Sequence, residues 1–396
     1  MGKSRIANLS AILVVGAMSV PLLASCSSTS SGTSSGTAKQ LAELKGSDTV
    51  ASDEFGVSVG ISGTNAVVGT SGAAYPGRAY VFNKTAAGWK QVAELKGSDT
   101  VAADRFGTAV AISGTTVVVG AYDHAKDAGR AYVFAKTAAG WKQVAELKGS
   151  DTVANDYFGW SVAISGTTAI VGAVGHAKYE GTAYVYNETA SGWKQSAELR
   201  GSDVVAENGF GTSVAISGST AIVGEEGYAK GTGRAYVFTK TTSGWTRVAL
   251  LKAPDTIAGD NFGTSVAVSP PIAVVGAYGR ANYAGRAYLF TDTDGGFRQT
   301  AELKGSDTTV GDYFGISAGI SGSSVVIGAY DHAKDAGRAY VFAKTPSGWK
   351  ETAELKGSDT VAEDYFGNSV AISGTTALTG AYGQAKYAGR AYLFKS

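Results

Sequence analysis

The chain has few cysteines, histidines and prolines, and its positive and negative charges nearly cancel. Its 396 residues include one cysteine, three histidines and six prolines. A single cysteine excludes any internal disulfide, so packing alone has to stabilise the fold. Lysine and arginine number 34 and aspartate and glutamate 33, and no basic stripe appears anywhere. We therefore expect no nucleic-acid partner.

What the chain has in abundance is a repeat. Phe-Gly recurs seven times, first 51 residues apart (Phe55 to Phe106) and then every 52 residues as far as Phe366. Residues 106–149 illustrate the unit: four short runs rich in Val, Ala, Ile, Tyr and Phe, separated by Gly, Ser, Thr or Asp. This pattern predicts four β-strands and no helix. The fourth run interleaves charged and apolar residues, as in a half-exposed strand.

The chain ends indicate how the units are arranged. The repeats begin at Lys39 with a segment that matches the fourth strand of later units, and they end at Ser396 after a third strand. Pairing the two ends would close a ring without an open sheet edge. We therefore predict an all-β, seven-bladed β-propeller of four-stranded antiparallel blades, rather than an open solenoid. The N-terminal strand completes the last blade, and we expect Leu41 and Leu44 to be buried there.

The order Phe-Gly, then Ser-Val-Ala-Ile, then Val-Gly-Ala resembles the FG-GAP repeat of integrin α-subunit propellers and of many bacterial envelope proteins. The resemblance covers Lys39 to Ser396 and implies the propeller fold. Two features depart from it. The Pro of Gly-Ala-Pro is replaced, by Tyr122, Val174, Glu226, Tyr278, Tyr330 and Tyr382. The Asp-rich calcium loop is replaced by turns such as residues 113–116, so no calcium, other metal or cofactor is expected.

The N-terminal residues differ from the rest. Lys3 and Arg5 precede an apolar run from Ala11 to Ala24 that is too short to span a bilayer. The run leads into Leu-Ala-Ser-Cys, which resembles a bacterial lipobox ending at Cys26. We therefore predict a signal peptide over residues 1–25, a lipid on Cys26 and a Ser/Gly/Thr-rich tether over 26–38. The propeller, 39–396, would be anchored to the outer face of a membrane in a bacterial cell envelope.

Propeller loops divide between two faces. The loops from strand four to one and from strand two to three share one face, and the tight turns share the other. Aromatic and charged residues gather in the two-to-three loops, which are therefore the predicted ligand-binding surface. The candidate residues are Tyr122, Asp123, His124, Lys126, His176, Lys178, Tyr278, Arg280, Tyr330, Asp331, His332, Lys334, Tyr382 and Lys386.

Other groups suit structural roles better. Two aspartates recur in nearly every four-to-one loop, where they would accept hydrogen bonds from loop N–H groups or pair with the arginines that follow Gly. The three histidines lie in separate blades and should not converge on one zinc ion. Glu225 and Glu226 lack a partner carboxylate for glycoside hydrolysis. Asp292 and Asp294 suit a hairpin turn, with weak calcium binding as the alternative.

No catalytic set of Ser, His and Asp or of Cys and His is readable. The leading hypothesis is a monomeric, non-enzymatic surface protein that binds another protein, for adhesion or scaffolding. A lectin-like module with repeated glycan sites is the alternative. An enzyme with its site in the central funnel is a third, disfavoured because catalysis usually breaks the symmetry that these loops keep.

Overall fold

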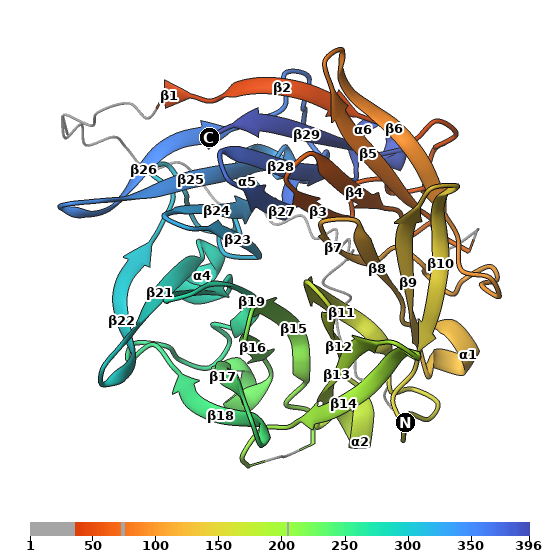
Figure 1. Cartoon of the computed structure of the whole chain (residues 1–396). Coiled ribbons are helices and arrows are strands. Elements are labelled where there is room, and N and C mark those ends of the chain that lie inside the picture. The colour runs from red at the N-terminus through yellow and green to blue at the C-terminus, as the bar shows by residue number, and fades with distance from the viewer. Residues whose placement is uncertain (1–35, 73–75, 204–205) are drawn as a thin grey trace, which may run out of the picture.

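The computed structural model describes residues 36–72, 76–203 and 206–396 and forms a seven-bladed β-propeller (Figure 1). Each blade is built on a four-stranded antiparallel sheet, as predicted. The first strand of each blade lies nearest the axis. Blade one comprises β3 (Ser58–Ser62), β4 (Asn65–Gly69), β5 (Ala79–Thr85) and β6 (Gly88–Leu95). Blade two comprises β7 (Ala109–Ser113), β8 (Thr116–Ala121), β9 (Arg130–Thr137) and β10 (Gly140–Leu147). Blade three comprises β11 (Phe158–Ser165), β12 (Thr168–Ala173), β13 (Thr182–Thr189) and β14 (Gly192–Leu199).

The remaining blades repeat this plan. Blade four comprises β15 (Phe210–Ser217), β16 (Thr220–Glu225), β17 (Arg234–Thr241) and β18 (Gly244–Leu251). Blade five comprises β19 (Phe262–Ser269), β20 (Ile272–Ala277), β21 (Arg286–Thr293) and β22 (Gly296–Leu303). Blade six comprises β23 (Ser317–Ser321), β24 (Ser324–Ala329), β25 (Arg338–Thr345) and β26 (Gly348–Leu355). Blade seven holds β27 (Phe366–Ser373), β28 (Thr376–Ala381) and β29 (Arg390–Lys395), and its fourth strand is β2 (Lys39–Leu44).

The pairing of β2 with β29 confirms the predicted closure of the ring. Lys39 lies opposite Lys395 and Leu44 opposite Ala391. Leu44 is buried, but Leu41 is 39% exposed, because it occupies a bulge between Gln40 and Ala42. The expectation that both leucines are buried was therefore wrong for Leu41. A further strand, β1 (Gly36–Thr37), pairs in parallel with β26 of blade six.

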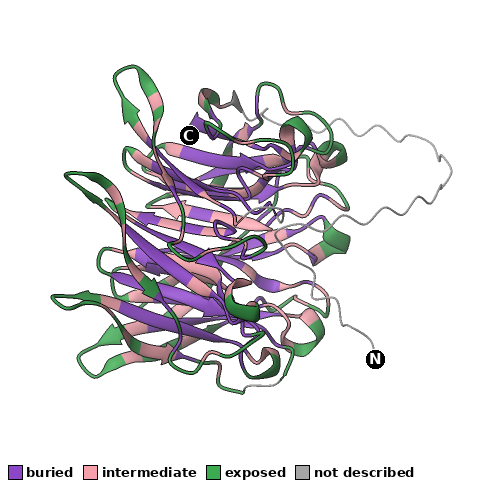
Figure 2. Ribbon diagram, turned by 90° about the vertical axis from the view of Figure 1, so that its right-hand side faces the viewer, coloured by how far each residue is buried: buried purple, intermediate pink, exposed green. Residues whose placement is uncertain are grey.

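The core lies between neighbouring blades (Figure 2). Phe106 is fully buried and its ring lies 5.5 Å from that of Tyr132 in the same blade. These large side chains pack against Ala79 and Val81 on the smaller face of blade one. The blades approach so closely that a Cβ on Gly120 would lie 2.0 Å from the carbonyl oxygen of Gly159 in the next blade. Glycine at this point of each repeat therefore permits the blades to pack.

The two-to-three loops contain short helical turns, so the prediction of no helix was wrong there. Six loops each hold a four-residue turn: α1 (His124–Asp127), α2 (His176–Tyr179), α3 (Tyr228–Gly231), α4 (Arg280–Tyr283), α5 (His332–Asp335) and α6 (Gln384–Tyr387). Four residues carry too little periodicity to be recognised in a sequence. Within the described ranges, no helix is long and apolar enough to span a membrane.

Candidate functional site

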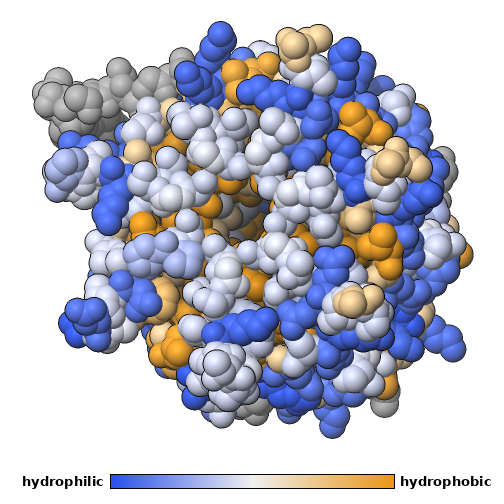
Figure 3. Space-filling model, in the orientation of Figure 1, coloured by the Kyte–Doolittle hydropathy of each residue, from blue (hydrophilic) through white to orange (hydrophobic). Residues whose placement is uncertain are grey.

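The two faces of the ring differ in what they present. Hairpin tips project from the left of Figure 2, whereas the short helical turns lie toward its right. Figure 3 views the hairpin face, which is pale around a central hollow and blue toward its rim. The opposite face is formed by the four-to-one and two-to-three loops, and we call it the loop face. All the candidate binding residues belong to its loops.

The loop backbone holds neighbouring blades together. In α1, the residues Ala125, Lys126 and Asp127 have φ values of 55°, 62° and 66°, which side-chain-bearing residues seldom adopt. Their carbonyls accept hydrogen bonds from blade three: the N–H of Asn155 donates to Lys126 at 3.3 Å and that of Tyr157 to Asp127 at 2.8 Å. The left-handed turn is therefore stabilised by the next blade, and the Lys126 side chain projects into solvent.

The recurring aspartates have the structural role predicted for them. Asp104 accepts a 2.7 Å hydrogen bond from the N–H of Val101, three residues earlier in the same loop. Equivalent bonds bind Asp53, Asp156, Asp260, Asp312 and Asp364 to their loops. Among the residues that the structure describes, the expected pairing with the Gly-Arg arginines occurs for Arg78 with Asp48 and for Arg234 with Asp203 and for no other arginine of this set. The arginines of blades two, five, six and seven donate instead to a fourth-strand glutamate on the neighbouring strand, as in Arg130 with Glu146 at 2.8 Å. Arg78 contacts Glu94 in the same way.

Each histidine lies between the two aspartates of its own blade. His124 donates from Nδ1 to Asp104 at 2.8 Å, and its Nε2 lies 3.5 Å from Asp99. His332 repeats this arrangement with Asp312 and Asp307. His176 does so with Asp156 and Asp151, and Glu198 also approaches it. The three histidines thus take part in three separate networks.

Tyrosines from three consecutive blades contact one another at the loop-face ends of the inner strands. Tyr278 lies 5.5 Å from Tyr313, centroid to centroid, and Tyr313 lies 5.4 Å from Tyr330. Tyr330 then lies 6.0 Å from Tyr365, whose ring is parallel to that of Tyr382 at 5.0 Å. We call these five residues the aromatic arc. Tyr283, which is 45% exposed, extends it at the Tyr278 end.

The sequence identified only part of this arc. Tyr278, Tyr330 and Tyr382 were candidates, whereas Tyr313 and Tyr365 were missed. Both missed residues directly precede Phe-Gly, and the same aromatic at Tyr157 was the available signal. Tyr122 and Tyr382 are only 3% and 6% exposed, so both are packed residues that offer a ligand little surface. Tyr122 instead packs near Trp160, at 4.9 Å.

Charges near the aromatic arc are acidic. Burial raises the pKa values of Tyr278, Tyr313 and Tyr382, and carboxylates raise them further: Glu226 acts on Tyr278, Asp331 and Asp335 on Tyr313, and Glu54 on Tyr382. Burial also raises the pKa of Asp331 to about 7. Asp123, at the far side of the face, has its pKa raised by burial to about 6, although Arg105 at 2.9 Å opposes this.

The remaining candidates are separated around the rim. The side chains of Lys126, Lys178, Lys334 and Lys386 are exposed. Arg280 donates to Asp255 at 2.8 Å. These groups lie one per blade and do not converge on a single point, so the structure brings together the tyrosines but not the lysines.

Glu225 and the segment of residues 292–294 have structural roles. Glu225 and Arg234 are 0% and 1% exposed and form a buried ion pair, which Asn208 supports with a 3.1 Å hydrogen bond to Glu225. Asp294 lies in the two-residue turn between β21 and β22, so the hairpin reading of residues 292–294 is confirmed. Cys26 and the predicted signal peptide lie outside the described residues, as does most of the tether.

Known proteins resemble this chain in fold more than in sequence. No curated protein matches it. The crystal structure of a mitotic checkpoint complex contains a chain of similar fold, with a TM-score of 0.58, 12% identity and coverage of 97% of this chain and 99% of that one. Sqt1 of Saccharomyces cerevisiae gives a TM-score of 0.49 at 12% identity, covering 91% of this chain and 99% of its own.

The sequence identifies the family of the chain more specifically than the fold does. The FG-GAP repeat matches seven times, at residues 39–82, 89–134, 141–186, 193–238, 245–290, 297–342 and 349–394. These matches span most of the chain and follow the seven Phe-Gly units that build the blades. The chain therefore belongs to the FG-GAP repeat family.

Proposed function

We propose that this protein is a non-enzymatic scaffold that binds partner proteins through its loop face. The observation that carries the proposal is the aromatic arc, in which tyrosines of blades five, six and seven meet across the blade boundaries. Tyrosine is enriched at protein interfaces because its ring offers rigid contact area and its hydroxyl offers a hydrogen bond. A continuous set of such rings suits one large partner surface.

The charge around the arc indicates the chemistry of the partner. Four carboxyl groups, those of Glu54, Glu226, Asp331 and Asp335, act on its tyrosines. Burial raises the pKa of Glu226, Asp331 and Asp335, so a cationic group placed beside them would favour their ionised form. Carboxylates beside aromatic rings favour guanidinium and ammonium groups, through ion pairing and cation–π contacts. We therefore propose that the partner presents an exposed arginine or lysine to the arc.

We further propose that the propeller is displayed on the bacterial cell envelope by a lipid on Cys26. The motivation is the lipobox-like segment that ends there. Metabolic labelling with a fatty-acid probe tests the anchor. The wild type should incorporate the probe and fractionate with membranes, and Cys26→Ser should do neither; a labelled, membrane-bound Cys26→Ser protein would refute the lipid site.

Site-specific cross-linking tests the binding face. A photoreactive phenylalanine analogue at Tyr283, which is exposed beside the arc, should cross-link a protein in an envelope extract. The same analogue at Lys136, in a hairpin on the opposite face, is the control. Cross-links at Lys136 alone would contradict the proposal. Selective retention on a glycan array without any protein cross-link would favour the lectin-like alternative instead.

A further inference from the structure

Blade three departs from the other six at two positions that concern one carboxylate. Where they begin their third strand with arginine after Gly, blade three has Thr182. Where they place lysine after the fourth strand, blade three has Arg200. In blade two, Arg130 binds Glu146, whereas in blade three the equivalent Glu198 binds Arg200, with Nε at 2.8 Å. The arginine that binds this glutamate thus follows the fourth strand in blade three, whereas it begins the third strand in blade two.

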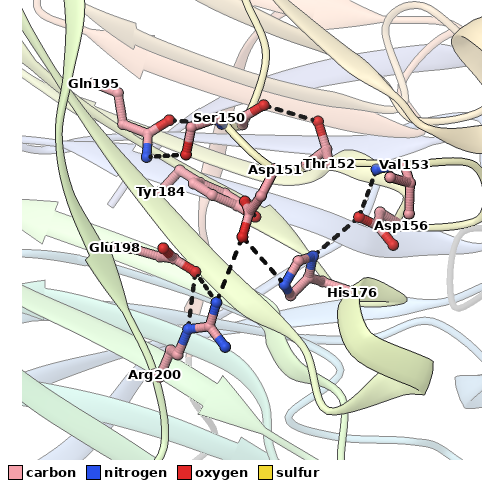
Figure 4. A network of polar contacts seen from close by, with 11 residues as sticks. Ser150, Asp151, Thr152, Val153, Asp156, His176, Tyr184, Gln195, Glu198 and Arg200 are labelled. Atoms are coloured by element: carbon pink, nitrogen blue, oxygen red, sulfur yellow. Dashed lines mark hydrogen bonds and ion pairs between the residues drawn. The ribbon is translucent and has the colours of Figure 1, made fainter.

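This exchange places Glu198 beside the histidine network of its blade (Figure 4). Asp151 Oδ2 lies 3.7 Å from His176 Nε2, and one ligand atom from each of Asp151, His176 and Glu198 lies within 4.8 Å of the others. Arg200 reaches the same point and lies 3.6 Å from Asp151. Among the described residues this is the one such group of His and carboxylate ligands.

The histidine is already oriented as a metal ligand would be. Its Nδ1–H donates to the buried carboxylate of Asp156 at 3.0 Å. A carboxylate on one ring nitrogen fixes the tautomer and leaves a lone pair on the other, which is the usual second-shell arrangement of a zinc-bound histidine. Here the free nitrogen, Nε2, is the one that faces Asp151.

Exposure and charge favour a divalent cation at this point. The side chains of Asp151 and Arg200 are 45% and 43% exposed, so a metal ion can enter from solvent and Arg200 can move away. Asp151 and Glu198 together carry two negative charges against one on Arg200. Zinc bonds of about 2.0 Å need ligand atoms about 3.3 Å apart, so a contraction of about 1.5 Å at most is required. Flexible, partly exposed carboxylates can supply it.

We propose that Asp151, His176 and Glu198 form a binding site for a divalent first-row transition-metal ion, with Zn²⁺ as the test ion. Arg200 occupies the cation position when the metal is absent. Nitrogen and carboxylate ligands in this number suit Zn²⁺ and leave a fourth position for water. The three histidines lie in separate blades and do not converge, whereas this site uses one histidine and two carboxylates from a single blade.

Titration calorimetry with ZnCl₂ tests the site in the tag-free full chain carrying Cys26→Ser, so that the lone thiol does not contribute. We expect one saturable site, an affinity at least about tenfold lower in His176→Ala, and no change in His124→Ala. His124 is the matched control, because Arg130 holds the glutamate of its blade. Absence of a saturable site, or equal losses in the two histidine variants, would overturn the proposal.

Two further variants test the role of the arginine. Arg200→Ala should tighten zinc binding, because it removes the competing cation. Thr182→Arg should weaken it, because the new arginine can engage Glu198 as in the other blades. A folded Thr182→Arg protein, verified by its thermal melt, that binds zinc as the wild type does would contradict the account. Should that variant not fold, the comparison of the two histidine variants decides.

Discussion

The hydroxyl of Tyr132, near the start of the third strand of blade two, donates a 2.7 Å hydrogen bond to Asp99 in the preceding four-to-one loop. The tyrosine is fully buried, whereas the Asp99 side chain is 47% exposed. The same pair recurs as Tyr80 with Asp48, Tyr184 with Asp151, Tyr288 with Asp255, Tyr340 with Asp307 and Tyr392 with Asp359. In blade four, Asp203 binds Arg234 instead. In the other six blades the pair fixes the four-to-one loop to its own blade.

Tyr132→Phe should therefore lower the free energy of unfolding by about 0.5–1.5 kcal/mol, because Asp99 can turn to solvent when its partner is lost. Urea unfolding measures the change. Lys136→Ala, in an exposed hairpin, is the control and should change stability by less than about 0.5 kcal/mol. A Tyr132→Phe protein as stable as the control would show that the bond contributes nothing.

Ring closure should depend on β2. Deleting residues 39–44 exposes the edge of β29 and removes the buried Leu44, which alone should cost about 2–5 kcal/mol. Deleting residues 28–35, before the first described strand, should leave stability unchanged. Thermal melts of the two deletion variants compare them directly, and equal melting temperatures would disprove the closure.

Loss of the ion pair between Arg234 and Glu225 should lower the free energy of unfolding more than loss of an exposed ion pair. Both side chains are almost wholly buried, so Glu225→Ala leaves a buried guanidinium whose one remaining carboxylate partner in the described part of the chain is the exposed Asp203. We expect a loss of about 3–5 kcal/mol. Glu302→Ala breaks the more exposed pair with Arg286 and should cost at most about 1 kcal/mol. Equal losses of unfolding free energy for Glu225→Ala and Glu302→Ala, measured by urea unfolding, would contradict this difference between the buried and the exposed pair.

Asp331 should make stability depend on pH. Burial raises its pKa to about 7 in the folded protein, against about 3.9 for an unfolded aspartate. The folded state therefore holds the proton more tightly, and ionisation of Asp331 destabilises it as pH rises from about 4 to 7. Asp331→Asn removes this penalty, so the variant should lose less stability than the wild type between pH 5 and pH 8. Asp294→Asn, in an exposed turn, should follow the wild type; a similar course for Asp331→Asn would refute the assignment.

The repeat allowed most of the fold to be predicted, because its period sets the number of blades and the unmatched strand at Lys39 sets the closure. The left-handed turns were not predictable, since Ala125 and Lys126 carry no local preference for positive φ and hydrogen bonds from the next blade impose it. Three of the five residues of the aromatic arc were predicted. Tyr313 and Tyr330 are 17 positions apart in sequence and meet only once a strand hairpin has folded between them.

The central claim is that the aromatic arc binds a partner protein. Tyr278, Tyr313 and Tyr330 are its partly exposed members, so their replacement by alanine removes contact area with less disturbance of the core than replacement of the buried Tyr382. The control set lies in the turns of the opposite face and comprises Thr115→Ala, Thr167→Ala, Thr375→Ala and Lys136→Ala.

The most direct measurement is the affinity of the partner identified by cross-linking for the arc variant and the control variant, each verified as folded by its thermal melt. The account predicts that the arc variant binds at least about thirtyfold more weakly than the wild type, as for loss of an interface hot spot worth about 2 kcal/mol or more, and that the control variant binds normally. Normal binding by the arc variant together with loss of binding by the control variant would contradict it.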